Sequence, residues 1–379
     1  MTRPGVALLA LLFAWAPLHT EAAADVASQY ASLAPKKAIA SDPSGAAVAS
    51  NGGHASDAAA AVAAFQACES RRRALGADAP CEVTRLNDDT VTTGAEIRAR
   101  VPQGRHPLFL WRFESPSASV YLAGSMHVMK PTLHPLPVQL ERAFAQSDHI
   151  AVEVNTLAVS GTQMQDIVRR HALFAPGRSL ADVVPAQTLA RLDSHLADQG
   201  IPFEAIASMK PALLATQLAV DRLTALGYFP QFGVDQYFIT RAGSRPVLEL
   251  ETIDAQIALL TSPTMDVQND MLALTLEQMD AIEPILTDMV VAWLSGDGDE
   301  LRRVFDEQSP QTEAYAAFNR RLLDERNVGM ADSIERYLAT PGRYFVLVGA
   351  AHLAGEGSIV DVLRRRGIRG ARIHSDDQI

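Results

Sequence analysis

The chain has 379 residues, of which 48% are hydrophobic, and its 33 basic against 44 acidic side chains give a net charge of −11. That length suits one large domain or two ordinary ones, and the acidity argues against binding to nucleic acids or to an anionic membrane surface, both of which need a basic face. Two cysteines are too few for a disulfide-rich scaffold or a four-thiolate zinc site.

Residues 1–24 are typical of an export signal. Arg3 supplies a positive start, an uncharged apolar stretch follows over residues 6–17, and three alanines precede Asp25, the expected mature N-terminus. The apolar stretch is shorter than the roughly 20 residues needed to span a bilayer. We therefore expect a periplasmic or secreted protein with no integral membrane span, the alternative being that the segment is a buried N-terminal helix.

Two further segments precede the main body. Residues 25–56 are rich in Ala, Ser and Gly without periodicity, which predicts a flexible leader. Residues 57–100 predict a small helix–strand module, with a helix over 58–75 that ends at a turn at Gly76. We expect this module to be too small to carry chemistry and to be separate from the body.

The two cysteines lie inside this module. Cys68 and Cys81 are separated by twelve residues, among them Gly76 and Pro80, which can turn the chain. In an oxidising compartment a disulfide closing so short a loop contributes about 3 kcal/mol. A metal pair is the alternative, but no histidine is near either cysteine, so we predict a Cys68–Cys81 bridge.

The body, residues 107–375, alternates apolar strands with long helices. We therefore predict a mixed α/β fold: a largely buried central sheet flanked by helices, with a large helical insertion, beside the small N-terminal disulfide-pinned segment. The expected strands lie within residues 108–113, 119–124, 149–154, 246–251 and 344–353, and the expected helices within 137–147, 211–226, 265–294 and 314–338.

One local pattern, Gly-x-x-His, occurs at the end of two of these strands. The first runs from Gly124 to His127 and the second from Gly349 to His352. We expect each glycine to let the chain leave its strand in a conformation that other residues resist. Each histidine then follows the carboxyl end of a strand, where open α/β sheets bind their ligands.

Glu153 interrupts a third apolar strand near its end. A buried carboxylate is costly unless it is paired or bound to a metal. Two histidines and a glutamate are a usual protein ligand set for a catalytic divalent ion, and this set does not select sharply between Zn, Mn and Co. The alternative is a structural glutamate paired with an arginine.

The segments LAGSMHV, AVEVN, FGVDQYF, RPVLELETIDAQ, LLDERNVGMADSI and VLVGAAHLAGEGSIVDVLRRRGI, in this order, resemble the TraB/GumN family. That family is related to the Tiki metalloproteases and to the ChaN/erythromycin-esterase-like group. The resemblance covers residues 107–375 and implies a metal-dependent hydrolase, with peptidase activity in part of the group. Other members inhibit signalling by peptide pheromones.

The resemblance also implies roles for particular residues. His127, Glu153 and His352, the predicted metal ligands, match motif positions of the family, and the remaining matches are Glu251 of the L-E-T segment and Arg326 with Asn327 of its R-N pair, which are the predicted catalytic residues.

The residues themselves indicate similar roles. Glu251 at a strand end is placed to be a general base or a further ligand. Arg326 is suited to clamp a substrate carboxylate or to stabilise an oxyanion, the alternative being a helix-surface ion pair with Asp324 or another acid. Asp235 is a weaker candidate for a group that orients another side chain.

These observations predict an exported, metal-dependent hydrolase that acts on a peptide or peptide-like bond. Motifs for zincins, for α/β-hydrolase nucleophile elbows and for P-loops are absent from the sequence. One alternative is a noncatalytic protein that binds a peptide or partner in the same cleft, with the histidines as scaffold groups. Another is an esterase that uses His and Glu without a metal.

Overall fold

The computed structural model describes residue 26 and residues 28–379, so the predicted export signal lies outside the described residues. Within the described part of the chain, we find no helix whose length and apolar character would let it cross a bilayer.

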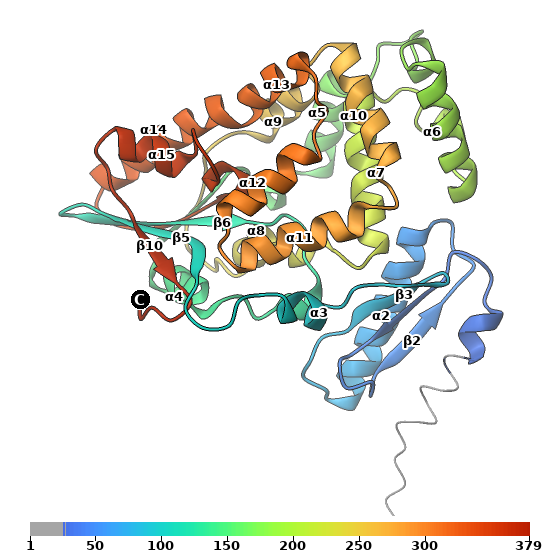
Figure 1. The fold of residues 1–379 in the computed structure, drawn as a ribbon, viewed down its shortest axis with the longest axis horizontal. Helices are drawn as coiled ribbons and strands as arrows, with labels where there is room; N and C mark the ends of the chain where they lie inside the picture. Colours follow the sequence, from blue (N-terminus) through green and yellow to red (C-terminus); the bar gives the residue numbers. More distant parts are fainter. Residues whose placement is uncertain (1–25, 27) are drawn as a thin grey trace, which may run out of the picture.

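The body is built on a six-stranded mixed sheet, which confirms the predicted fold class (Figure 1). Four strands of this sheet, in the order β6-β9-β7-β8, are parallel, while β5 pairs antiparallel with β6 at one side and β10 pairs antiparallel with β5. The strands are β5 (Pro107–Glu114), β6 (Ala118–Ser125), β7 (His149–Val152), β8 (Val247–Glu249), β9 (Gly342–Gly349) and β10 (Ala371–His374).

Helices lie on both sides of this sheet, with α14 and α15 on one side and α4 and α8 on the other (Figure 1). The predicted helical insertion is present as two runs, α5 to α8 between β7 and β8, and α9 to α14 between β8 and β9. The α-helices of the body are α3 (Gly94–Ala99), α4 (Val138–Gln146), α5 (Gly161–His171), α6 (Ala186–Gln199), α7 (Pro211–Ala225), α8 (Val234–Ile239), α9 (Ile253–Leu260), α10 (Met265–Glu277), α11 (Ile282–Leu294), α12 (Gly298–Glu307), α13 (Glu313–Arg320), α14 (Arg326–Ala339) and α15 (Ile359–Arg365).

Short helical turns complete the body. The five-residue segment η6 (Arg321–Glu325) is a π-helix between α13 and α14, and such segments are frequent at functional sites. The 3₁₀ turns are η1 (Pro131–Leu133), η2 (Thr156–Ala158), η3 (Leu180–Asp182), η4 (Phe203–Ala205), η5 (Pro230–Phe232) and η7 (Ala350–Leu353).

Two of the predicted helices are divided. The helix expected over 265–294 is α10 followed by α11, because Pro284 lies in the first turn of α11, where no N–H donor is needed, and would break the interior of a continuous helix. The helix expected over 314–338 is α13, η6 and α14 in succession. Strand β10 was not predicted, since its sequence ARIH is short and half polar.

The prediction of a flexible leader over residues 25–56 does not hold for the segment that the structure describes. It contains β1 (Ala38–Ser41) and β2 (Val48–Asn51), which join β3 (Glu82–Leu86) and β4 (Asp89–Thr90) in a sheet of order β2-β1-β3-β4. Ala38, Ala40 and Ala47 are fully buried in the core that the sheet shares with α2 (Asp57–Leu75). The small side chains that suggested disorder therefore permit close packing of a sheet on a helix.

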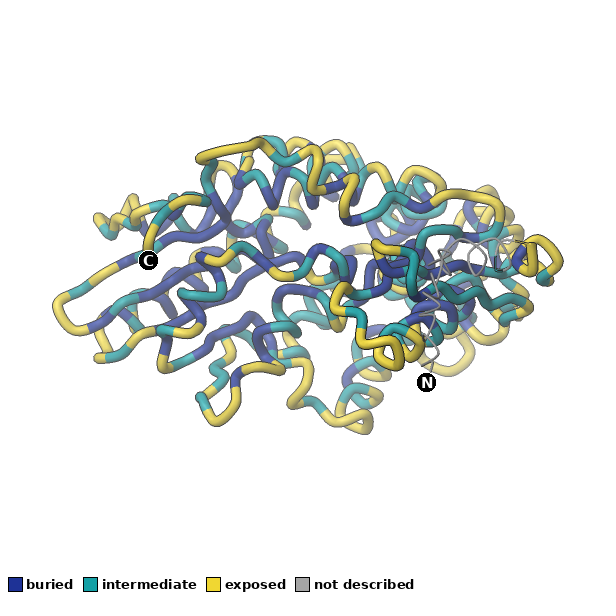
Figure 2. Tube along the Cα trace, turned by 90° about the horizontal axis from the view of Figure 1, so that it is seen from below, coloured by how far each residue is buried: buried dark blue, intermediate teal, exposed yellow. Residues whose placement is uncertain are grey.

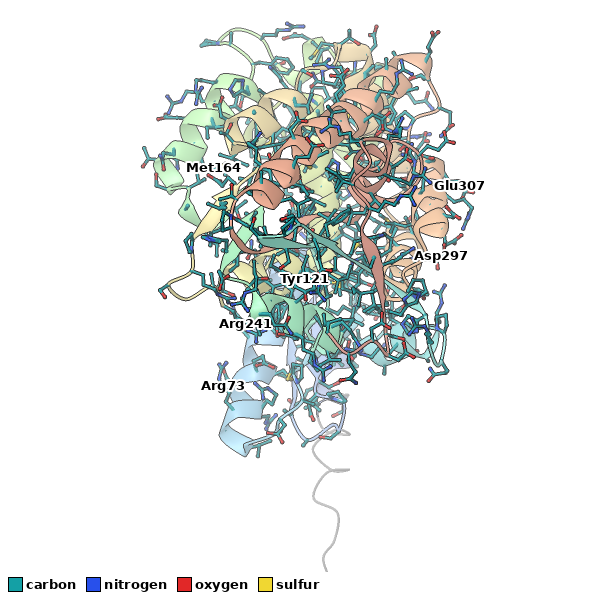
Figure 3. The ribbon with its side chains drawn as sticks, turned by 90° about the vertical axis from the view of Figure 1, so that its left-hand side faces the viewer. Arg73, Tyr121, Met164, Arg241, Asp297 and Glu307 are labelled. Carbon is teal, nitrogen blue, oxygen red and sulfur yellow. A yellow bond between two sulfur atoms is a disulfide. The ribbon has the colours of Figure 1, made fainter. Side chains whose placement is uncertain are left out.

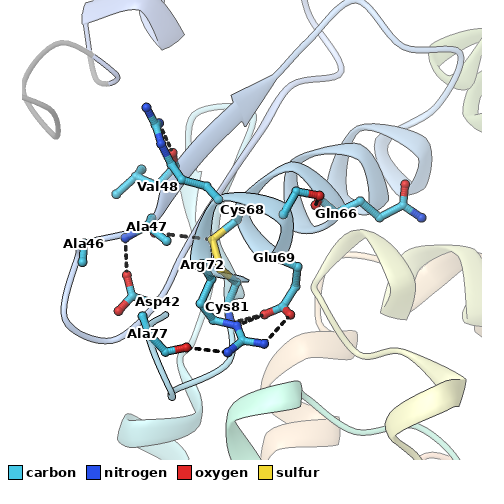
Figure 4. The surroundings of a disulfide bond; sticks show 12 residues. Asp42, Ala46, Ala47, Val48, Gln66, Cys68, Glu69, Arg72, Ala77 and Cys81 are labelled. Carbon is cyan, nitrogen blue, oxygen red and sulfur yellow. Dashed lines mark hydrogen bonds and ion pairs between the residues drawn. A yellow bond between two sulfur atoms is a disulfide. The ribbon is translucent and has the colours of Figure 1, made fainter. Parts of the chain in front are cut away.

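The predicted disulfide is present and joins α2 to the segment that leads into β3 (Figure 4). The Cα atoms of Cys68 and Cys81 are 6.1 Å apart. Beside the bridge, the Glu69 carboxylate accepts hydrogen bonds from the Cys81 N–H and from the Arg72 guanidinium. These contacts hold the two ends of the loop together at the same point as the covalent bond.

The N-terminal module is not separate from the body, contrary to expectation. In Figure 3 it projects from one side of the body, but its core is continuous with the larger one, and buried residues run from one into the other in Figure 2. The Phe65 ring of α2 lies 4.8 Å from the Phe229 ring, and the Glu82 carboxylate accepts hydrogen bonds from Gly94 N–H and the Thr132 hydroxyl. Large aromatic rings buried across the contact make the two parts one folding unit.

A fully buried lysine lies at this contact. The Lys130 ammonium donates a hydrogen bond to the Leu226 carbonyl (2.6 Å) and lies 4.4 Å from the centre of the Tyr228 ring. Burial lowers the pKa of Lys130 to about 8, although the carboxylates of Glu82 and Glu283 act in the opposite direction.

Removal of the disulfide is expected to destabilise the whole protein. Cys68→Ala combined with Cys81→Ala should lower the free energy of unfolding by about 3 kcal/mol, because the bridge closes a short loop in the unfolded chain. Denaturant titration should show a single shifted transition, since module and body share a core. Two transitions, with the second unmoved, would contradict the shared core.

Lys130 is expected to make stability depend on pH in the alkaline range. Between about pH 8 and pH 10.5 the unfolded chain keeps this proton while the folded chain releases it, so the folded state gains stability as pH rises. The free energy of unfolding of the wild type should therefore increase relative to that of Lys130→Met across this interval. A difference that stays constant with pH would show that Lys130 remains charged in the fold.

Candidate functional site

The predicted site residues meet at the carboxyl edge of the four parallel strands. Ser125 of β6 pairs with Gly349 of β9, and Val152 of β7 pairs with Leu347, so the residues that follow these strands begin at the same level. At this edge His127 follows β6, Glu153 follows β7, Glu251 follows β8, and His352 lies in η7 after β9.

Both glycines of the Gly-x-x-His turns are required for space and not for an unusual backbone conformation. Gly349 has φ −51°, which any residue adopts. A Cβ there, however, would lie 3.3 Å from Glu153 Oε1 and 3.4 Å from His127 Nε2, and a Cβ at Gly124 would lie 3.2 Å from the Ala350 Cα. The expectation about backbone conformation was wrong, and the close approach of neighbouring segments is the physical reason for glycine.

Arg326 connects these segments through every N–H of its guanidinium. Nε donates to Glu251 (2.9 Å), and Nη2 donates to Glu251 (2.8 Å) and to Glu153 (2.5 Å). Nη1 donates to the Leu322 carbonyl (3.0 Å) and to His352 Nε2 (3.1 Å). All five donors are used, so Arg326 has none left for a substrate carboxylate or oxyanion, and it is not the surface ion-pair partner of Asp324.

The Glu153 side chain is almost fully buried and fully hydrogen-bonded. Its Oε1 accepts from the Gly349 N–H (2.5 Å), and its Oε2 accepts from Arg326 and from Gln256 Nε2 (3.0 Å). Burial acts to raise the pKa of Glu153, but the facing charges of His127 and Arg326, with the hydrogen bond from the Gly349 N–H, outweigh it and lower the pKa to about 2. Glu153 is therefore an ionised carboxylate that ties the start of the second Gly-x-x-His turn to β7.

His352 is held in one tautomer. Its Nδ1 donates to Asn327 Oδ1 (2.7 Å), and Asn327 Nδ2 donates in turn to the Gly357 carbonyl (2.9 Å), which fixes the orientation of the amide. Nε2 is thus left without a hydrogen and accepts from Arg326. Burial lowers the pKa of His352 to about 4, in agreement with a neutral ring.

His127 differs from His352 in the hydrogen-bond partners of its two ring nitrogens. Nδ1 is 2.8 Å from Asp235 Oδ2, and this carboxylate raises the pKa of His127 to about 9. Among the described residues Nε2 has no hydrogen-bond partner. The side chain is 67% exposed, but it faces a cavity beside the sheet edge. Asp235, a weak candidate from sequence, is the group that orients His127.

Sequence reasoning missed Gln256, whose amide donates to both Glu153 and Glu251 (3.0 and 3.2 Å). It lies in the first turns of α9, five residues after Glu251, and that spacing on a helix that begins at the site is the signal that could have indicated it. Glu249, by contrast, lies away from the site and accepts from the Asn155 N–H.

The cavity beside His127 has a volume of about 590 Å³, within the range of ligand sites. Its polar residues come from the ends of β6, β7 and β9 and from Thr216 of α7, Gln256 of α9 and Arg326 of α14. Its apolar walls come mainly from α9, α11, α12 and η6. Glu251 does not line it. Arg326 lies at its wall and also borders a separate outer groove, so it forms part of the partition between the two.

The predicted metal ligands come together, but the residues present do not fit a divalent ion in this arrangement. A neutral imidazole has one lone pair, and that of His352 is taken by Arg326. Both oxygens of Glu153 accept N–H groups, one of them from the same guanidinium. Accordingly, residues 26 and 28–379 contain no group of three His, Cys, Asp or Glu side chains arranged to hold a metal. The cation among these ligands is the guanidinium of Arg326.

Comparisons with known proteins show the family to which the chain is related. The sequence model of the TraB/PrgY/gumN family matches residues 109–372. The uncharacterized protein YbaP of Escherichia coli (strain K12) is 26% identical over 249 residues, which cover 64% of this chain and 87% of YbaP. An uncharacterized protein of Treponema pallidum (strain Nichols) is 21% identical over 268 residues, which cover 68% of this chain and 80% of that protein. No solved structure matches the chain.

Replacing the guanidinium tests whether it excludes a metal. Arg326→Met leaves two carboxylates and the His352 lone pair without their partner, which should cost about 3–5 kcal/mol of folding free energy. Zn²⁺ or Mn²⁺ should restore much of that stability in the variant and leave the wild type unchanged, as measured by thermal unfolding and by metal content after dialysis.

Arg321→Met is the matched control, because Arg321 lies in the π-helix that directly precedes Arg326, is exposed and donates to the Ser262 hydroxyl. It should behave as the wild type does. Stoichiometric metal in the wild type that is lost in His127→Ala and His352→Ala would refute the exclusion and restore the predicted metal site.

Proposed function

The chain belongs to the TraB/PrgY/gumN family, and from this premise we propose that it is a hydrolase of peptide or peptide-like bonds whose proton-transferring group is His127. The observation that carries the proposal is the state of the two ring nitrogens of His127. Nδ1 is held by Asp235 (2.8 Å), while Nε2 has no hydrogen-bond partner among the described residues, and the side chain lines the cavity.

This geometry suits acid–base catalysis. A carboxylate on Nδ1 fixes the ring and its tautomer, so that Nε2 is presented to a bound molecule in one orientation. When a carbonyl compound occupies the cavity, Nε2 can donate a proton to the departing group and accept one from the attacking water. No step of this scheme uses a metal ion.

The other residues of the site act as positioning residues in this proposal. Glu153 binds the Gly349 N–H, and Asn327 and Arg326 bind the two nitrogens of His352. Together they hold the turn after β9, which lines the cavity next to His127. Glu251, predicted as a general base, instead neutralises Arg326 and does not line the cavity.

We also propose that the protein acts outside the cytoplasm, in the periplasm or after secretion. The Cys68–Cys81 bridge supports this, because disulfides persist in oxidising compartments. The export signal expected over residues 1–24 remains a prediction.

One observation favours a second candidate, a noncatalytic protein that binds a peptide or partner in the same cavity. The network of Glu153, Arg326 and His352 is fully satisfied without any bound molecule, as expected of a scaffold. In that case His127 contributes a hydrogen bond to the bound molecule and nothing is turned over.

Turnover of a mixed library of peptides and acyl amides distinguishes the two candidates. His127→Ala should lower the rate at least about 100-fold, the usual contribution of a general acid–base group, and Asp235→Asn should lower it in the same direction. His106→Ala, which changes a histidine at a distant groove, should have no effect. Chelator should leave the wild-type rate unchanged.

Product released equally by the wild type and His127→Ala would refute the role of His127. Saturable binding without product in every variant would establish the binding protein. Loss of activity on adding chelator would show that the reaction depends on a metal ion, as predicted from the sequence.

A further inference from the structure

Apart from its polar end and Thr216, the cavity beside His127 is lined by apolar side chains, most of them aliphatic, with one aromatic ring, that of Phe305. They come from four elements that are distant in sequence: Ile257 and Leu260 of α9, Met289 of α11, Leu301 of α12 and Leu322 of η6. The acid–base site therefore opens into a space whose walls favour apolar contents.

The other ionisable side chains at the polar end of the cavity have few hydrogen-bond donors or acceptors left for a bound molecule. Arg326 has no free donor, and both oxygens of Glu153 are occupied. Burial keeps His352 neutral, and its single lone pair is taken. Among the described residues that line the cavity, His127 is thus the one ionisable side chain that is free to bind a molecule in it.

Helix α9 shows that the cavity surface is incompletely covered in the protein alone. Its sequence, IDAQIALL, is strongly apolar, yet none of its residues is buried. The helix is nevertheless held in place, because Asp254 forms ion pairs with Arg170 and His171 of α5. A fixed apolar wall that remains accessible gains free energy when an apolar group covers it, at roughly 25 cal/mol per Å².

The occupant that suits these walls has its polar group at one end, where His127 and the buried Ser125 hydroxyl, which has no hydrogen-bond partner among the described residues, line the cavity. A peptide segment is less suited even when its side chains are apolar, because each residue carries a backbone N–H and C=O that need partners when buried. An acyl chain carries a single carbonyl, which can lie at His127, while its methylene groups need no partner.

We propose that the cavity binds the acyl chain of an N-acylated substrate, with the amide carbonyl at His127 and the amine portion outside. This assignment rests on the proposed function for its chemistry. In the reaction, the oxygen of water bonds to the carbonyl carbon and the C–N bond breaks. The amine leaves with a proton from His127 Nε2, which regains one from the attacking water, and the chain is released as a carboxylic acid.

Binding can be tested separately from turnover with N-acylglycinamides of increasing chain length, measured by isothermal titration calorimetry on the full mature chain and on His127→Ala. Affinity should rise about fourfold for each added methylene until the cavity is full. N-acetyl-Leu-Leu-amide, an apolar peptide of comparable size, should bind at least tenfold more weakly than the acyl amide of equal carbon number.

Variants that change the wall locate the effect. Leu260→Trp fills the cavity and Ile257→Asn makes its wall polar, so each should reduce the affinity for long acyl chains at least tenfold while short-chain binding changes less. Leu157→Trp, at a side chain that is 52% exposed and outside the cavity, is the control. The unfolding midpoint of each variant confirms that it is folded.

The possible failures are distinguishable. Affinity independent of chain length, or a dipeptide amide bound as tightly as the acyl amides, would overturn the assignment of the cavity. Chain-length-dependent binding by the wild type with no product formed would leave that assignment standing and would refute the hydrolase.

Discussion

The contact of one guanidinium with two carboxylates holds the functional end of this protein together. Arg326 follows the π-helix, whereas Glu153 follows β7, Glu251 follows β8, and His352 belongs to the turn after β9. Two neighbouring carboxylates, one buried and one half-buried, would repel, and a half-buried guanidinium alone would be costly. Each is tolerated because the bidentate geometry satisfies all of them at once. Of the cavity walls, this set of bonds holds the segments after β7 and β9 and the junction of η6 with α14.

The central sheet makes this contact possible. Parallel neighbours in the order β6-β9-β7-β8 bring the segments after all four strands to one edge, although these segments are spread over more than half of the chain. The approach is so close that a Cβ at Gly349 would lie 3.3 Å from Glu153 Oε1 and 3.4 Å from His127 Nε2, so these neighbours would have to shift slightly to admit one. The same crowding that removes water from Glu153 and His352 leaves His127 beside a cavity, so two histidines in equivalent turns have opposite protonation preferences.

The N-terminal module contributes to this arrangement through packing and not through chemistry. Its contact with the body buries Phe65 against Phe229 and encloses Lys130, which lies three residues after His127 along the chain. The turn that carries His127 is thus continued by a segment fixed between the two parts. The disulfide stabilises the module, and through the shared core it supports the body as well.

Patterns that are local in the sequence determined much of the structure. Apolar runs located five strands of the large sheet, the spacing of Cys68 and Cys81 identified the bridge, and the two Gly-x-x-His turns with Glu153 identified the edge at which side chains gather. The tertiary structure alone decided that Arg326 takes the place expected for a metal, that Asp235 pairs with His127, and that the alanine-rich leader is a sheet. The reason is that hydrogen-bond partners and packing partners are chosen among groups distant in sequence. The sequence can therefore identify the side chains whose lone pairs gather at the site. It cannot show whether those lone pairs bind a metal ion or the N–H groups of an arginine.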